Sequence, residues 1–228
     1  MCGFIQRVTD SPAVIDLIEQ IGLGHLTGTF KSEAQGVLNF YPAFGKNPSR
    51  MISNLIVSSD TVVDATWWFD CKANGDALVV GDRTTFNARN LDSPFWKGAI
   101  RYHRALVIAT AVGESNKEGA SNAHYLMEGE KALLIGAVYR EYDNGLYSTA
   151  VITRPPHERF SKYHSKSIPC FLPPDKGFVG AWLNGEADDP IVQSELANPT
   201  IHTPLKVTRV KTFKGGQALS EPEILAAD

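Results

Sequence analysis

Cys2, the second residue of the chain, could do chemistry that an internal cysteine cannot. Methionine before a small residue is normally trimmed, and loss of Met1 would leave Cys2 with a free α-amine beside its thiol. The reference pKa is about 7.7–8.0 for the amine and about 8.5 for the thiol, so part of each is nucleophilic at neutral pH. Such a pair can attack an acyl or amide carbon through the thiolate, with the amine as local base, or close a five-membered thiazolidine ring on an aldehyde. The plainer alternative is a small residue at a frayed chain start.

Three polar residues further along the chain could serve such chemistry. The amide of Asn87 can donate and accept hydrogen bonds and so orient the reacting groups, whereas its structural role would be to cap a turn. Glu114 follows a predicted strand and could move protons if burial raises its pKa toward neutrality, although an ordinary surface glutamate remains open. His164 titrates near neutral pH and could act as a general acid, and the alternative is a histidine paired with a carboxylate at a helix end.

Basic and aromatic residues are unevenly spread along the chain. The net charge is −3, which speaks weakly against nucleic acid, but residues 83–104, 154–166 and 206–214 are locally basic. On charge alone, such segments are more often solvated faces than binding surfaces. Trp67 and Trp68 are adjacent, so in a strand they would point to opposite faces and at most one need be core. Burial of both remains open if the strand ends there.

The composition is that of an ordinary globular protein. The chain has 228 residues, of which 43% are hydrophobic and 21% charged, so a disordered or fibrous protein is excluded. Its apolar runs are far shorter than the roughly 18 residues of a membrane helix. The first residues lack the pattern of a signal peptide, so we expect a cytoplasmic protein. An odd number of cysteines, three, argues against a disulfide framework there.

Secondary-structure signals predict one domain of mixed class. Ser11-Pro12 followed by apolar residues at helical spacing predicts an early helix, and Asp189-Pro190 starts another that reaches about residue 197. Pro155-Pro156 also looks like a helix start. Strands are predicted at residues 51–63, 76–80, 105–112, 133–140 and 147–153. We therefore predict an α+β fold, a single domain around an antiparallel, barrel-like sheet with flanking helices, spanning residues 2–213. Residues 214–228 are predicted to be an acidic, mobile tail.

The candidate groups follow one another in an order that resembles the SOS-response-associated peptidase family, or SRAP domain. In that family the mature protein begins with cysteine and crosslinks covalently to abasic sites in single-stranded DNA. The resemblance covers nearly the whole chain, to Phe213. The motifs that carry it are Met1-Cys2-Gly3, Asn39-Phe40-Tyr41-Pro42, Trp67-Trp68, Thr85-Phe86-Asn87-Ala88-Arg89, Gly113-Glu114, Val151-Ile152-Thr153 and His164-Ser165-Lys166-Ser167-Ile168-Pro169.

The resemblance implies roles for individual residues. Cys2 would form a thiazolidine with the aldehyde of the opened abasic sugar, and Asn87, Glu114 and His164 would complete the catalytic set. The same acid–base pair would reverse the crosslink and help to remove Met1. Single-stranded DNA needs a basic groove and flat side chains on which bases stack. The predicted DNA-binding residues are Arg89, carried over from the family, the aromatic and proline candidates Trp67, Trp68 and Pro42, and Lys166, Arg101, Lys206 and Arg209, offered from local charge.

The chain departs from the family pattern around several of these motifs. Phe4 stands where an arginine usually follows Cys-Gly, and Leu91 stands where a glutamate is usual. The aromatic residues that usually surround the glutamate are here Val112, Gly113 and Ser115. The histidine frame is one residue longer and lacks its arginine, so that Lys166 or Ser167 must stand in. These departures affect DNA contacts more than the chemistry.

Two other functions stay open at this stage. Glutamine amidotransferases with an N-terminal cysteine also begin Met-Cys-Gly, but their substrate-clamping arginine motif is absent here. A non-catalytic single-strand binding module of the same fold would explain the altered motifs. No metal or other cofactor is expected, since Cys71 and Cys170 are isolated and the histidines lack ligand spacing. The expected partner is single-stranded DNA with abasic sites, bound by a monomer, with no membrane association.

Overall fold

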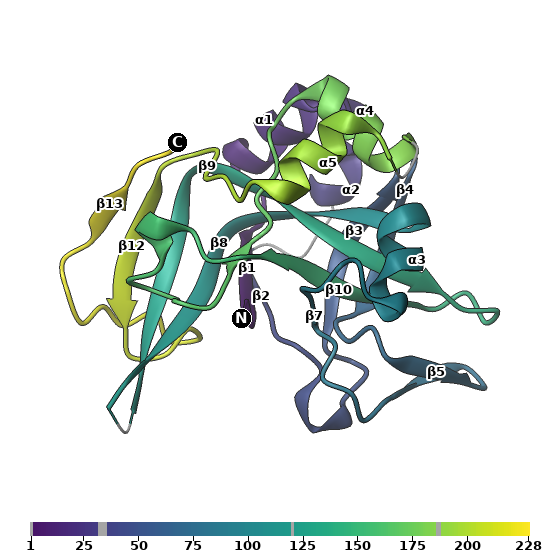
Figure 1. Ribbon diagram of the computed structural model, residues 1–228, viewed down its shortest axis with the longest axis horizontal. Coiled ribbons are helices and arrows are strands. Elements are labelled where there is room, and N and C mark those ends of the chain that lie inside the picture. Colours follow the sequence, from purple (N-terminus) through teal and green to yellow (C-terminus); the bar gives the residue numbers. More distant parts are fainter. Residues whose placement is uncertain (1, 32–35, 120, 186–187) are drawn as a thin grey trace.

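A closed ring of strands forms the centre of the computed structural model, which describes residues 2–31, 36–119, 121–185 and 188–228 (Figure 1). Within these residues, the ring runs β9–β10–β4–β3–β8 and closes by pairing β8 with β9. Its strands are β3 (Met51–Ser58), β4 (Thr61–Thr66), β8 (Arg104–Glu118), β9 (Ser121–Glu141) and β10 (Tyr147–Arg154). The predicted α+β single domain with a barrel-like sheet is confirmed.

The sheet is mixed rather than purely antiparallel, which corrects that part of the prediction. β10 runs parallel to β4, with Tyr147 opposite Ala65. It also runs parallel to the short strand β7 (Asn87–Ala88), with Val151 opposite Asn87. A parallel pair needs a long crossover, and here the chain makes it through β5 (Cys71–Asn74), β6 (Ala77–Val80), α3 (Pro94–Tyr102) and the long hairpin of β8 and β9.

Alternating side chains of β8 separate two apolar cores. Ala105, Val107 and Ala109 point into the barrel, whereas Leu106 and Ile108 point toward the helices. Figure 1 shows the helices α1 (Pro12–Gln20), α2 (Thr27–Lys31), α4 (Lys176–Asn184) and α5 (Pro190–Ala197) gathered on one side of the barrel. The early helix and the helix at residues 190–197 were predicted, whereas α3 and α4 were not. In the described residues, no helix is long and apolar enough to cross a membrane.

Outer strands extend the hairpin of β8 and β9 beyond the barrel. β1 (Phe4–Val8) pairs with β8 and with β2 (Val37–Phe40), and β12 (Leu205–Val210) pairs with β9 and β13 (Glu223–Leu225). Arg7 is fully buried and anchors β1, because its guanidinium donates to the carbonyl oxygens of Ile108 and Ser53. β1 therefore holds the start of the chain against β8.

Two predicted elements need correction. Residues 51–63 form not one strand but β3 and the first part of β4, which pair as an antiparallel hairpin with a turn at Ser59-Asp60. The Pro155-Pro156 start leads only to the short turn η3 (Glu158–Phe160). The remaining short elements are η1 (Gly24–Leu26), η2 (Phe44–Lys46) and β11 (Ile168–Pro169).

The C-terminal tail is packed onto the domain, which corrects the prediction of a mobile segment. Residues 223–225 form β13, paired with β12. The Asp228 carboxylate accepts a hydrogen bond from the backbone N–H of Ile201 at 2.7 Å. Arg159 donates to the carbonyl oxygen of Ala226 at 2.7 Å. Local composition could not show these contacts, because their partners lie far away in the sequence.

Candidate active site around Cys2

The pairing of β1 with β8 brings Cys2 to Glu114. Phe4 lies opposite Gly113 in the antiparallel register, so the two residues before Phe4 run alongside the residues that follow Gly113. Cys2 is fully buried at the edge of the barrel core. Met1 lies outside the described residues. Long-range strand pairing thus joins two candidates that are 112 positions apart.

Burial changes the expected reactivity of the Cys2 thiol. Burial, and after it the charge of Glu114, raises the pKa of this thiol above its usual range. The thiol is therefore protonated in the resting protein, whereas the sequence predicted a partly ionised nucleophile. Its proton must pass to a neighbouring base before sulfur can form a bond.

Asn87 is held directly against Cys2. Its Nδ2 donates to the carbonyl oxygen of Cys2 at 2.8 Å. Its Oδ1 is buried and accepts no hydrogen bond from the described residues. The strand β7 fixes Asn87 through the pairing with Val151. Asn87 therefore positions Cys2 with one end of its amide and offers a buried acceptor with the other.

Glu114 is a buried carboxyl group, so the surface alternative is wrong. It is 1% exposed, and burial raises its pKa from its ordinary 4.5 to about 7. Burial thus raises the pKa of Glu114 toward neutrality, as a role in proton transfer requires. A carboxyl with a pKa near the working pH can both accept and return a proton.

His164 lies beside Glu114. Its Nδ1 donates to the carbonyl oxygen of Ser115 at 2.8 Å and lies 3.8 Å from the Glu114 Oε2. Because a carbonyl oxygen only accepts, the ring proton sits on Nδ1, and Nε2 is the nitrogen that can take up a proton. Desolvation, together with the nearby charges of Lys166 and Arg89, lowers the pKa of His164. The resting imidazole is therefore neutral at pH 7.

The aromatic side chains near Glu114 come from segments far away in the sequence, not from the residues next to Glu114 as in the family pattern. The rings of Phe4 and Phe213 stack with centroids 4.9 Å apart. A Cβ atom at Gly113 would lie 2.7 Å from the Phe213 ring and 2.8 Å from the Phe4 ring. The missing side chain at Gly113 thus leaves room for Phe4, the residue that stands in the family's arginine position. The departures from the family pattern at Phe4 and at Gly113 therefore compensate for each other.

The predicted stacking residues lie at the end of β4, but they are buried. β4 ends at Thr66, so strand alternation no longer separates Trp67 and Trp68. Trp67 is 0% exposed, its Nε1 donates to the Phe86 carbonyl oxygen, and it cannot stack on a base. Trp68 is 6% exposed, and Pro42 is buried as well.

Phe44 is an exposed aromatic residue that sequence analysis missed. It is 48% exposed, and its ring packs edge-on against Trp68 with centroids 5.6 Å apart. It also packs edge-on against Phe86, at 5.0 Å. The only sequence signal was its position two residues after Pro42, and a single aromatic residue in a loop is a weak signal.

Two of the predicted basic residues lie beside His164. Arg89 is exposed and donates through Nη2 to the carbonyl oxygen of Lys166. The Lys166 side chain is exposed, whereas Ser167, the other candidate for the missing arginine, is 0% exposed. Arg89 and Lys166 therefore provide positive charge next to the site.

The other predicted basic residues are engaged with surface acids. On β12, Lys206 lies 3.1 Å from Glu128. Arg209 on the same strand lies 2.8 Å from Glu118. Arg101 belongs to α3, on a different element from Cys2, Asn87, Glu114 and His164. Among the described residues, no hydrogen bond or ion pair links these three cations to Arg89 or Lys166.

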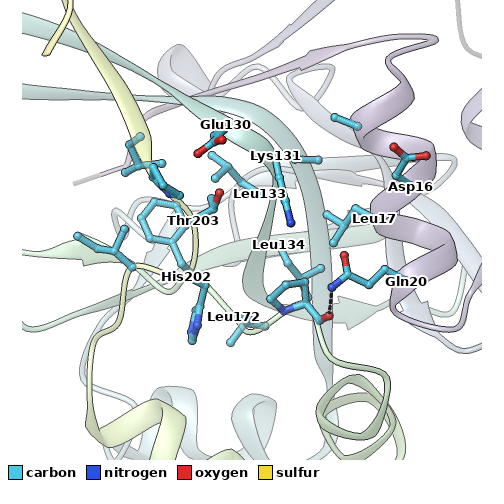
Figure 2. A pocket seen from close by; sticks show the side chains of 17 residues that line it. Asp16, Leu17, Gln20, Glu130, Lys131, Leu133, Leu134, Leu172, His202 and Thr203 are labelled. Carbon is cyan, nitrogen blue, oxygen red and sulfur yellow. Dashed lines mark hydrogen bonds between the residues drawn. The ribbon is translucent and has the colours of Figure 1, made fainter. Parts of the chain in front are cut away.

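A cavity of about 630 Å³ lies away from these residues, between α1, β9 and two connecting segments (Figure 2). Leu17, Leu133, Leu134 and Leu172 form much of its wall, with Asp16, Glu130 and Lys131 also around it. None of the predicted site residues lines this cavity. Cavity size alone would therefore have pointed away from Cys2.

Solved structures show the same fold. A protein from Bacteroides thetaiotaomicron is 18% identical and has a TM-score of 0.64, over 91% of this chain and 92% of that chain. A protein from Bordetella bronchiseptica is 16% identical with a TM-score of 0.65, over 92% and 100% of the two chains. A phage-related protein from Bordetella bronchiseptica is 17% identical with a TM-score of 0.60, over 97% and 100%.

Comparison with curated proteins gives no match. The family model of the SOS response associated peptidase (SRAP) matches residues 1–213, which is most of the chain. The matched range includes Cys2, Asn87, Glu114 and His164, the residues that the fold gathers. The chain therefore belongs to the SRAP family.

Proposed function

We propose that this protein captures abasic sites in single-stranded DNA by forming a thiazolidine at Cys2. The observation that carries the proposal is the buried Glu114, whose pKa of about 7 suits proton transfer and whose charge acts on Cys2. Asn87 and His164 flank this pair. Membership of the SRAP family supports the same conclusion.

The reaction needs the α-amine of Cys2 to be free. Hydrolysis of the Met1–Cys2 bond consumes one water and releases methionine. The amine then attacks C1′ of the opened deoxyribose, forming a carbinolamine that loses one water to give an imine. The sulfur adds to the imine carbon, and the proton released by the thiol ends on nitrogen. The product is a five-membered ring holding C1′, with one water released.

Glu114, His164 and Asn87 each suit one step of this reaction through their protonation or hydrogen bonding. Glu114 in its carboxylate form takes the proton from the amine or thiol, which matters because burial keeps the thiol protonated. His164 takes up a proton on Nε2 and returns it to the departing hydroxyl. The buried Oδ1 of Asn87 accepts a hydrogen bond from the amine or the sugar. The reverse sequence would release the crosslink.

The single strand would approach from the side of Arg89 and Lys166. Both cations lie close enough to His164 to lower its pKa. Phe44 presents an exposed ring over Trp68 and Phe86, which makes it a better platform for an unstacked base than the buried Trp67. Contacts to phosphate position the strand without reading its sequence.

The test is denaturing gel electrophoresis of the protein with a single-stranded oligonucleotide that carries one abasic site. Controls are the intact strand and the Cys2→Ala variant, and a mass spectrum confirms loss of Met1. We expect a shifted band that survives denaturation, requires the abasic site and is absent with Cys2→Ala.

Absence of this band from protein that has lost Met1 would overturn the proposal. Two further assays then separate the remaining functions. Glutaminase activity that requires Cys2 would indicate an amidotransferase, and binding of intact single strands without a crosslink would indicate a binding module.

A further inference from the structure

The cavity beside α1 and β9, here called the α1–β9 cavity, has no part in the chemistry proposed for Cys2 (Figure 2). Its volume of about 630 Å³ lies within the range of about 300–1,000 Å³ that is typical of small-molecule sites. Leu17, Leu133 and Leu134 give it a buried apolar wall. Among the described residues that line it there is no cysteine. The cavity therefore suits binding of a ligand rather than a second covalent reaction.

Hydrogen bonds join the walls of the α1–β9 cavity to one another. Gln20 of α1 donates to the carbonyl oxygen of Pro174, in the segment before α4, at 2.8 Å, a bond drawn as a dashed line in Figure 2. The backbone N–H of Glu130 in β9 donates to the carbonyl oxygen of Pro204, in the segment before β12, at 2.9 Å. The cavity is therefore preformed, so that a ligand does not have to order its walls on binding.

A bulge in β9 brings Lys131 to the α1–β9 cavity. The pairing of β8 with β9 shifts register at Thr110, which faces residues 129–132 of β9. Gly129 permits the bend, because a Cβ atom there would lie 2.2 Å from the carbonyl oxygen of Lys131. Figure 2 shows the Lys131 side chain running into the cavity with its Nζ atom toward the middle. Bulges commonly re-aim a side chain in this way beside functional sites.

The charged side chains around the cavity include both signs, and they are not paired. Within the described part of the chain, no ion pair involves Lys131, Asp16 or Glu130, although all three line the same cavity. The Thr203 Oγ1 atom is buried in the cavity wall and has no hydrogen-bond partner among the described residues. The cavity thus offers a cation, two carboxylates and a hydroxyl group beside an apolar wall.

We propose that the α1–β9 cavity binds a short apolar peptide whose two termini are free. Lys131 pairs with the carboxylate of the peptide, and Asp16 or Glu130 pairs with its ammonium group. The leucine wall holds the apolar side chains, and the Thr203 hydroxyl donates a hydrogen bond to the peptide. This site goes beyond the function proposed above and does not rest on it.

A zwitterion with an apolar body accounts for the lining better than a ligand of one charge. A simple anion would face both Asp16 and Glu130, and a simple cation would face Lys131. His202 also lines the cavity, but its Nε2 already lies 2.7 Å from the Glu195 carboxylate. The opposite charges of the cavity do not touch each other, which favours a peptide with separated ends over a single amino acid.

Isothermal titration calorimetry of the full chain with L-leucyl-L-leucine tests the site. We expect saturable binding, and at least about 10-fold weaker binding of both N-acetyl-leucyl-leucine and leucyl-leucinamide, since each lacks one charge-assisted contact. Free leucine should also bind at least about 10-fold more weakly, because it covers less of the apolar wall. No binding of leucyl-leucine, equal binding of the three dipeptides, or equally tight binding of free leucine would overturn the proposal.

Substitutions assign each charge to one end of the peptide. In Lys131→Gln, leucyl-leucine and leucyl-leucinamide should bind with similar affinity, because the contact to the carboxylate is missing. In Asp16→Asn combined with Glu130→Gln, leucyl-leucine and its N-acetyl form should bind with similar affinity. All three residues are exposed, so the urea midpoints of the free proteins should stay close to that of the wild type. The matched control is Lys97→Gln, an exposed lysine of α3 that does not line the cavity. Wild-type preferences in all of these variants would overturn the proposal.

A last comparison separates the α1–β9 cavity from the site around Cys2. Cys2 does not line the cavity, so Cys2→Ala should bind leucyl-leucine as tightly as the wild-type protein does. Loss of binding in Cys2→Ala would place the peptide at the Cys2 site and overturn the proposal.

Discussion

Glu114 shows how one buried carboxyl group can link the chemistry of this protein to its stability. The group is almost completely removed from water, and its pKa of about 7 reflects the cost of holding its charge there. That same cost makes it a base that can also return a proton near neutral pH.

The crosslinking rate should rise with pH up to about 7 and then level off, because Glu114 must be ionised to accept a proton. Glu114→Gln should slow crosslinking about 10²- to 10⁴-fold and remove this limb. A second change of the crosslinking rate with pH, caused by protonation of His164, should remain below pH 6.5 because desolvation lowers the pKa of that residue. Single-turnover gel assays across pH 5–9 measure both. A limb near 7 that persists in Glu114→Gln would assign it to another group.

Glu114→Gln should also stabilise the protein at high pH. The glutamate ionises near 4.5 in the unfolded chain and near 7 in the folded protein, so the folded state holds the extra proton between these values. Stability from this group therefore falls as the pH rises from 4.5 through 7. The variant escapes that penalty, by up to about 3 kcal/mol above pH 7 and by nothing below 4.5. Urea unfolding of both proteins at pH 4.5 and pH 8 measures the difference, and an equal difference at both pH values would contradict the prediction.

At the scale of the element, the C-terminal segment braces the loop that carries His164. Lys162 pairs with Glu223 of β13 at 2.5 Å. His157 lies 3.3 Å from the Asp228 carboxylate, to which Arg159 also donates. The contacts therefore tie both ends of residues 157–162 to the segment after β12. The side chain of His164 is thus positioned by a part of the chain that the sequence had suggested was mobile.

Breaking these contacts should affect the reaction more than the stability. In Glu223→Gln combined with Asp228→Asn, we expect a several-fold lower crosslinking rate, because the His164 loop loses its brace. Exposed ion pairs contribute only about 0–1 kcal/mol each, so the unfolding midpoint should change little. Glu128→Gln is the matched control, since Glu128 pairs with Lys206 away from that loop. Equal rates in the double variant, the control and the wild type would show that the brace does not position His164.

At the scale of the whole molecule, the distribution of charge should limit affinity for intact DNA. The net charge is −3, and Lys206 and Arg209 are paired with acids. That leaves Arg89 and Lys166 as the predicted DNA-binding cations beside His164. Two phosphate contacts to a single strand correspond to a slope of log K against log salt of about −1.4. A slope of about −3 in the Cys2→Ala protein would show that Lys206 and Arg209 also contact the strand.

The proposed covalent capture would suit such weak binding. A protein that contacts only a few phosphates gains little from electrostatics, but a bond at C1′ would hold the damaged strand regardless of salt. The packing around Gly113 fits this view. The stacked rings of Phe4 and Phe213 fill the space beside Glu114, where the family pattern predicted an arginine at the position of Phe4.

The sequence alone determined the chemical types of the site and much of the local structure. Cys2 was selected from its type and position, and Asn87, Glu114 and His164 from the resemblance of the motif order to a known family. α1, α5 and β10 follow from their starting residues and apolar spacing. The barrel-like α+β class also followed from the pattern of strands. These features depend on residues close together in the chain, where spacing is informative.

Only the tertiary structure decided how those types behave. The pairing of β1 with β8 buries Cys2 beside Glu114, and burial is what raises the pKa of both groups. The end of β4 before Trp67 and the packing of the tail likewise depend on contacts between distant segments. Periodicity carries no information about which distant strands pair, and desolvation depends on everything that surrounds a group. The sequence therefore names the reacting groups, while the fold sets their protonation, their exposure and their neighbours.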